Sequence, residues 1–191
     1  MRRIILASAS SRRKELLEQI GLQFQVDPGN NDEEIASASE PHEMAKKLSL
    51  GKARSAAPRH PNAIIIAADT IVGLGDRIFG KPHTNAEAKE MLRALNGRTH
   101  SVITGFTLLD TETGKALSRS VETKVCMKKL TPKEIEGYVR TKEPLDKAGG
   151  YAIQGRGAVL VDRIEGDQSN VVGLPLSALA EGLREFGVKV L

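Results

Sequence analysis

Hydroxyl and guanidinium side chains cluster in the run from Ser8 to Arg13, which reads Ser-Ala-Ser-Ser-Arg-Arg. The run follows a short apolar segment and precedes a helical pattern, so hydroxyls, helix N-terminal amides and two arginines could bind one anion. In the alternative, Ser10 or Ser11 only caps the helix, and Arg12 and Arg13 are solvated. Neither a Walker-type phosphate loop nor a GxGxxG turn occurs in the sequence, so Walker and Rossmann chemistry are disfavoured.

A single carboxylate, Asp69, interrupts the apolar run that extends from Ala63 to Val72. Burying a charged carboxylate among apolar side chains is costly without a partner, a metal or a proton, and such groups are often functional. On a strand, Asp69 could act as a general base toward water or as a metal ligand. It could equally be an Asx cap on the turn after the strand, and the residues alone leave both interpretations open.

Acidic and basic side chains elsewhere could complete a phosphate site. The group Asp32-Glu33-Glu34 follows turn residues and could hold Mg²⁺ or Mn²⁺ against phosphate oxygens, although such a run is more often solvated. Lys52 falls in a helical pattern, where a surface position is the alternative. Lys81 lies in a constrained loop between glycine and proline, which suits it to neutralise phosphate charge.

The segment from Leu145 to Gly155 is rich in glycine, which allows a backbone to approach a ligand closely. Gln154 in this segment offers both a donor and an acceptor, the combination needed to recognise the edge of a nucleobase. The alternative is a surface loop without a ligand.

The elements that must position these side chains alternate between strand and helix in the first half of the chain. Apolar runs predict strands at residues 3–7, 24–26 and 63–68, the last interrupted by Asp69-Thr70. Helical spacing predicts a helix that carries Leu16 and Leu17 and ends at Gly21, and another from Pro41 to just before Pro58.

The second half adds a helix at residues 88–95 and two long strands, 102–109 and 117–127, joined by a turn at residues 113–114. Residue types alternate along the second strand at Val121, Thr123, Val125 and Met127, which is typical of an antiparallel, half-solvated strand, so we expect a mixed sheet. Further helices are predicted after Pro132 and from Leu176 to Phe186, which makes the fold class α/β.

Composition limits the classes of protein to consider. The 191 residues suit one domain, and a single cysteine, Cys126, excludes an intramolecular disulfide and a cysteine-based zinc cluster, which fits a reducing cytoplasm. No apolar run approaches the roughly 18 residues of a membrane span. The net charge is +4, but the chain has no tryptophan, two tyrosines and four phenylalanines, so aromatic side chains on which nucleic-acid bases could stack are scarce. A site for a small anion therefore explains the charge better than a nucleic-acid surface. The histidines lack metal-ligand spacing, and each is expected on the surface or in a turn: His42, His60, His83 and His100.

Five motifs, taken together and in order, resemble the Maf family of nucleotide pyrophosphatases along the whole chain: LASASSRRKELL, DEE, AADTIV, GKP and EPLDKAGGYAIQG. The resemblance implies one domain over residues 1–191. It also implies an α/β fold similar to the inosine-triphosphate pyrophosphatases, with a long mixed sheet flanked by helices and two lobes around a cleft. The implied reaction is metal-assisted hydrolysis of a nucleoside triphosphate to its monophosphate and pyrophosphate.

By the same resemblance, Asp69 is the proton acceptor that activates water for attack at the α-phosphate. Lys52 and Lys81 join it as catalytic residues that neutralise the departing pyrophosphate, together with a divalent cation, Mg²⁺ or Mn²⁺. Ser8 and Arg13 bind the substrate phosphates. Glu33 matches the acidic position near the metal, with its two acidic neighbours as alternatives.

Substrate preference in the family follows three positions, which here hold Arg12, Thr70 and Gln154, the pattern of the dTTP/UTP branch. The branch that acts on 7-methyl-GTP typically has Trp, Gln and Glu there. A neutral glutamine can pair with the imide edge of uracil or thymine, whereas a glutamate better accepts protons from guanine. Where many members have Ala, this chain has Gly150, and it has Asn30-Asn31 before the acidic group.

Other interpretations remain open at this point. The chain could act on 7-methyl-GTP or another modified nucleotide, or it could be a nucleotide-binding regulator of septum formation and cell division, with which the family is associated. A nucleic-acid-binding module is motivated only by the positive charge. A small-molecule nucleotide is the expected partner, without a membrane or a nucleic-acid polymer, and the family suggests a homodimer.

Overall fold

The computed structural model describes residues 2–29 and 40–190, which form strands, α-helices and short 3-10 helices. The strands are β1 (Arg3–Leu6), β2 (Gln25–Val26), β3 (Ala63–Leu74), β4 (Arg77–Phe79), β5 (Thr99–Asp110), β6 (Ala116–Met127) and β7 (Val161–Glu165). The α-helices are α1 (Ser11–Gln19), α2 (Pro41–Ala56), α3 (Asn85–Leu95), α4 (Pro132–Arg140), α5 (Gln168–Val172) and α6 (Leu176–Arg184). The 3-10 helices are η1 (Ala57–Arg59), η2 (Glu143–Asp146), η3 (Ala148–Gly150) and η4 (Gly155–Leu160).

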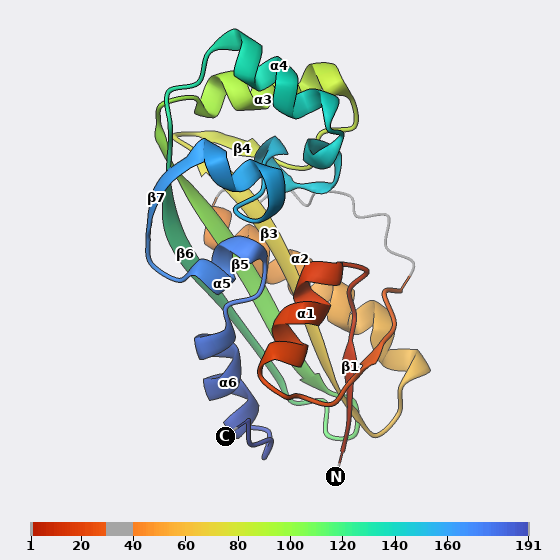
Figure 1. The fold of residues 1–191 in the computed structure, drawn as a ribbon. Coiled ribbons are helices and arrows are strands. Elements are labelled where there is room, and N and C mark those ends of the chain that lie inside the picture. Colours follow the sequence, from red (N-terminus) through yellow and green to blue (C-terminus); the bar gives the residue numbers. More distant parts are fainter. Residues whose placement is uncertain (1, 30–39, 191) are drawn as a thin grey trace. The chain divides into compact units, whose positions relative to one another are not determined.

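The strands form one mixed sheet in the order β2-β1-β3-β5-β6-β7, with β4 paired to β3 (Figure 1). β1 runs parallel to β2 and β3, whereas β4 is antiparallel to β3 and β7 is antiparallel to β6. The Thr111 amide donates to the Ala63 carbonyl, so the end of β5 lies beside the start of β3 and these strands are antiparallel. The predicted α/β fold with a mixed sheet flanked by helices is confirmed.

The chain divides into two compact units. The first comprises Met1–Asp69, Thr104–Val121 and Gly173–Leu191, and the second comprises Thr70–Ile103 and Glu122–Val172. Three strands, β3, β5 and β6, contribute residues to both units. The single domain over residues 1–191 and the cleft between two lobes stay predictions.

In the first unit, α2 covers one face of the strands (Figure 1). Alternate strand residues, among them Ile65 and Ala67, form a buried cluster with Ala53 and Ala56 of α2. Because side chains alternate across a strand, Asp69 lies on this α2-facing side.

On the opposite face of the same unit lie α1 and α6 (Figure 1). Gly182 in α6 approaches Phe106 and Leu108 of β5 closely. Ser10 begins α1 as its N-cap and accepts a hydrogen bond from the Arg13 amide.

The second unit has its own core between α3, α4 and the strand segments that it contains. Fully buried members include Leu92, Leu95 and Val125, and Tyr138 and Val139 bring α4 into the same cluster. A capping box of Thr131 and Glu134 starts α4, so both local sequence and burial favour the helix.

Two sequence predictions need correction, and two elements were not predicted. The expected interruption at Asp69-Thr70 is wrong, since β3 continues to Leu74 because its second half pairs with β4. His100 is not a surface residue: it lies in β5, 2% exposed, beside the Tyr151 hydroxyl. β7 and α5 were not predicted, because their short segments carry no clear periodicity.

Candidate functional site

The loop after β1 holds a hydroxyl and a guanidinium in fixed contact. Ser8 is 7% exposed, and its Oγ accepts hydrogen bonds from the Ser10 amide at 3.3 Å and from Arg13 Nη1 at 3.1 Å. Arg13 Nε donates to the Gly173 carbonyl at 2.8 Å. Ser10 is the helix cap that the simpler interpretation expected, but Arg13 is anchored at two points, so that interpretation is wrong for the second arginine.

Asp69 forms an ion pair with Lys52 of α2. Both side chains are 19% exposed, so neither is a freely solvated group. Asp69 stands within β3 and does not cap a turn after it, which rules out the Asx interpretation. The surface interpretation of Lys52 is also wrong, since the helix directs this lysine to the carboxylate.

Both pairs lie near the point in the first unit where β1 ends beside β3. Leu6 is in register with Ile66, and the Ala7 amide donates to the Ile66 carbonyl at 2.8 Å. The loop with Ser8 therefore starts beside β3, three residues before Asp69. The carboxyl ends of parallel strands are where open α/β sheets bind their ligands.

Two of the predicted specificity residues adjoin these pairs in sequence. Arg12 is half-buried on α1, directly before Arg13, and Thr70 is half-buried on β3, directly after Asp69. Because Thr70 follows Asp69 on a strand, its side chain faces the opposite side of the sheet.

Lys81 and Gln154 lie in the second unit, on two loops that are joined through their backbones. The Gly149 amide donates to the Gly80 carbonyl at 2.9 Å, which connects the loop after β4 to the glycine-rich segment. Lys81 and Gln154 are both exposed, and Gln154 directly precedes η4.

The predicted metal residue Glu33, with Asp32 and Glu34, lies outside the described residues. Within residues 2–29 and 40–190, no three His, Cys, Asp or Glu side chains form a group that could hold a metal ion. In that same part of the chain, no helix is both long and apolar enough to cross a membrane.

A second carboxylate, which sequence reasoning missed, organises the loop that carries Gln154. Glu143 Oε1 accepts from the Tyr138 hydroxyl at 3.0 Å and from the Gly157 amide at 2.9 Å, while Oε2 accepts from the Arg156 amide at 3.1 Å. The Tyr138 hydroxyl in turn accepts from the Ala152 amide at 3.2 Å. A signal was present, since Glu143 opens the fifth motif.

Electrostatics agree with this arrangement. Burial alone would raise the pKa of the Glu143 carboxyl, but hydrogen bonds from Gly157, Arg156 and Tyr138 outweigh it and lower that pKa. Burial, together with the adjacent carboxylate, raises the pKa of Tyr138. Glu143 therefore accepts as an anion, and Tyr138 donates as a neutral phenol.

Comparison with known proteins decides the family. The family model described as Maf-like protein matches residues 3–186. This chain belongs to the Maf family. A dTTP/UTP pyrophosphatase of Methanosarcina mazei is 50% identical to this Maf chain over 191 residues, which are 100% of this chain and 97% of that protein. A dTTP/UTP pyrophosphatase of Bacillus mycoides is 47% identical over 186 residues, covering 97% and 96%.

Two solved structures are also similar to the Maf chain. One is a nucleoside-triphosphatase / dITP/XTP pyrophosphatase from Mycobacterium abscessus, with a TM-score of 0.46 and 14% identity over 97% of this chain and 95% of that one. The other is the Ham1 protein of Staphylococcus aureus, with a TM-score of 0.48 and 16% identity over 83% and 79%.

The Maf motifs occupy defined places in this fold. The first spans the end of β1 and most of α1, the third lies in β3 around Asp69, and the fifth covers η2, η3 and the loop to Gly155. The resemblance to the Maf family stated from the sequence is thus confirmed, while the roles of the individual site residues stay predictions.

Proposed function

We propose that this chain hydrolyses nucleoside triphosphates, with dTTP and UTP as preferred substrates, to the nucleoside monophosphate and pyrophosphate. Relatives that carry the name dTTP/UTP pyrophosphatase match it over nearly the full length of both proteins. The observation that carries the proposal is the Lys52–Asp69 pair, a carboxylate held on a rigid strand beside the Ser8–Arg13 loop.

In the proposed reaction, Asp69 accepts a proton from water as the water oxygen bonds to the α-phosphorus. The bond from this phosphorus to the oxygen that bridges to the β-phosphate breaks, and pyrophosphate leaves with that oxygen. Lys52 holds the carboxylate in position through the ion pair. Arg13, oriented by Ser8 and Gly173, and Lys81 would neutralise the charge on the departing group.

A divalent cation, Mg²⁺ or Mn²⁺, belongs to the proposal. Asp69 is a hard oxygen ligand, but it is already paired with Lys52, and the described residues offer no three-ligand group. Glu33, which lies outside the described residues, is the proposed protein ligand, and substrate phosphates and water would complete the coordination of the cation. Bound there, the metal would withdraw charge from the phosphate oxygens.

Arg12, Thr70 and Gln154 are proposed to select the base. The neutral amide of Gln154 can both donate to and accept from the imide edge of uracil or thymine. A Gln154→Glu variant should therefore lose preference for UTP over 7-methyl-GTP, and an unchanged preference would contradict this role.

The decisive experiment is mass-spectrometric product analysis with dTTP, UTP, CTP and 7-methyl-GTP, run with Mg²⁺, with Mn²⁺ and with chelator. We expect monophosphate and pyrophosphate from dTTP and UTP in the presence of metal.

Asp69→Asn should lower kcat by roughly 10² to 10⁴, as removal of a general base does. Glu18→Gln, at an exposed position on α1, is the matched control. The mechanism would be rejected if Asp69→Asn kept the wild-type kcat, or if the products were nucleoside diphosphate and inorganic phosphate.

A further inference from the structure

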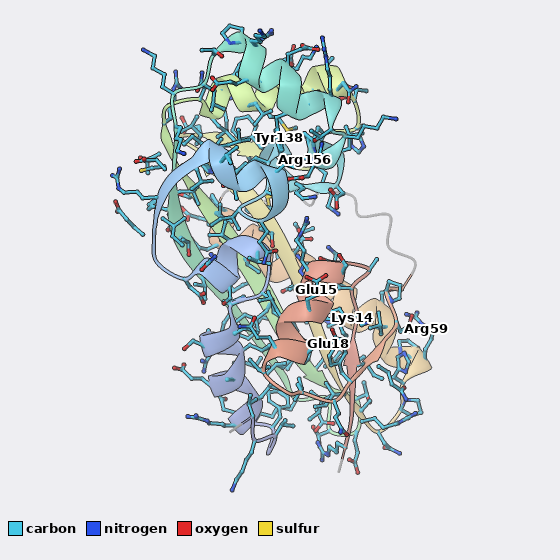
Figure 2. The ribbon with its side chains drawn as sticks, in the orientation of Figure 1. Lys14, Glu15, Glu18, Arg59, Tyr138 and Arg156 are labelled. Atoms are coloured by element: carbon cyan, nitrogen blue, oxygen red, sulfur yellow. The ribbon has the colours of Figure 1, made fainter. Side chains whose placement is uncertain are left out.

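The loop from Ala152 to Gly157 is attached at both ends to one pair of side chains. Before Gln154, the Ala152 amide donates to the Tyr138 hydroxyl, and after it the Arg156 and Gly157 amides donate to Glu143. Figure 2 shows Tyr138 and Arg156 close to each other in the second unit. Gln154 is thus the exposed middle of a short loop whose flanks are bound to a single acceptor network.

The backbone has little room to take another course. A Cβ on Gly157 would lie 2.4 Å from the Ala152 carbonyl oxygen and 2.7 Å from the Tyr138 hydroxyl. Gly155 has a φ of +68°, and a Cβ there would lie 3.2 Å from a Glu143 oxygen. The loop is folded tightly around these two side chains, so their hydrogen bonds define its path.

Glu143 is itself held in place by its neighbours. Lys142, just before it, has a φ of +61°, which is uncommon outside glycine and carries a conformational cost. The Thr141 hydroxyl accepts from the Glu143 amide at 3.2 Å, and Lys147 Nζ donates to the Glu143 carbonyl at 3.1 Å. The strained turn is compensated by contacts that direct the carboxylate to the loop.

We propose that Glu143 and Tyr138 are positioning residues that hold Gln154 in the orientation that selects the base of the substrate. This inference rests on the proposed function, because it concerns how that function distinguishes nucleotides. Neither residue is required to touch the substrate. Their effect passes through the loop, so they should influence base preference and KM far more than the chemical step.

The first test is Glu143→Gln, which keeps the size of the side chain but replaces an acceptor oxygen with a donor amide facing N–H and O–H groups. The KM for UTP should rise about tenfold and the preference for UTP over 7-methyl-GTP should fall, while kcat changes less than about threefold. Tyr138→Phe removes only the hydroxyl and should produce a smaller change in the same direction. Glu90→Gln, an exposed acid on α3 outside this network, is the matched control and should behave as wild type.

A double-mutant cycle with Gln154→Ala separates positioning from a general structural role. In the Gln154→Ala background, Glu143→Gln should no longer alter base preference, because the group that it positions is gone. Hydrogen exchange should accelerate at the Ala152, Arg156 and Gly157 amides in Glu143→Gln, with exchange in β3 unchanged.

Additive effects in the cycle, or equal loss of kcat on all nucleotides, would overturn the inference. Failure of both Glu143→Gln and Tyr138→Phe to fold would also overturn it, since the network would then serve stability of the whole second unit. A wild-type chain without pyrophosphatase activity would instead reject the proposed function, and this outcome is visible before any variant is compared.

Discussion

At the scale of single residues, the proposed chemistry can be tested most directly through the ion pair between Lys52 and Asp69. Asp69 and Lys52 come from a strand and a helix 17 positions apart in sequence and form an ion pair with little exposure. Removing one member of a largely buried pair costs more than removing an exposed one, because the remaining charge loses its partner. The pair therefore couples local stability to the position of the proposed base.

Lys52→Met should lower kcat/KM for dTTP and UTP by roughly 10², because the carboxylate loses the group that orients it. Steady-state kinetics with pyrophosphate detection measures this. Lys47→Met, at an exposed position on the same helix, serves as the control and should leave kcat/KM unchanged. Equal activity of the Lys52 variant and the control would show that the ion pair plays no part in catalysis.

His100 gives the chain a pH-dependent stability. Burial lowers the pKa of His100 to about 4, against about 6.5 in an unfolded chain. Between these values the unfolded state binds a proton that the folded state does not, so the free energy of unfolding falls as pH decreases from 6.5 to 4. The loss at the acid end amounts to at most about 3 kcal/mol.

Urea unfolding of wild type and His100→Gln at pH 7 and pH 4.5 isolates this contribution. Carboxylates protonate in both proteins, so the difference between them reports the histidine. Wild type should lose about 2 kcal/mol more than the variant between the two pH values. Parallel losses in the two proteins would mean that His100 is accessible to protons in the folded state.

At the scale of elements, contact between α2 and the sheet depends on a missing side chain. A Cβ on Gly105 of β5 would lie 2.2 Å from both the carbonyl carbon and oxygen of Ala45 in α2. Behind this contact, Ser49 of α2 hydrogen-bonds to Thr107 of β5 at 2.8 Å, and Thr107 to Ser118 of β6 at 2.8 Å. The helix that carries Lys52 is thus fixed by close backbone approach and a buried polar chain.

Gly105→Ala should destabilise the fold by about 3 kcal/mol or more. The added Cβ would clash with backbone atoms of α2, so the helix itself would have to move, because no flexible side chain lies there to shift instead. Thermal unfolding measures the effect. Gly51→Ala, on an open position of α2, should raise stability by up to about 1 kcal/mol, since alanine favours helix. A Gly105→Ala protein as stable as wild type would contradict the close approach of α2.

At the scale of the whole molecule, the two compact units share three strands. β3, β5 and β6 each cross from one unit to the other without a break, and no flexible linker divides them in these strands. Hydrogen-bonded strands propagate order along their length, so we expect the units to unfold together.

Calorimetry tests this expectation, and with it the predicted single domain. One transition should appear, with equal calorimetric and van't Hoff enthalpies. Two resolved transitions, or a calorimetric enthalpy well above the van't Hoff value, would mean that the units are separate folding domains.

Much of the fold follows from local sequence. The apolar run at Ala63–Ala68, the helical spacing before Gly21 and the turn between two long strands each predict an element that is present, because hydrophobic periodicity and turn residues act over a few positions. The five motifs likewise identified the family, since their residues and their order can be recognised directly in the sequence. The candidate residues Ser8, Arg13, Lys52 and Asp69 could be named on that basis.

The sequence could not say which candidates touch. Lys52 contacts Asp69, Gly173 anchors Arg13, and Glu143 shapes the loop around Gln154. These contacts join residues 13 to 160 positions apart in sequence. Side-chain contact depends on how elements pack, and packing is decided by sheet register and close backbone approach such as that at Gly105. Local sequence determined which chemical groups are available, and tertiary structure decided which of them are paired.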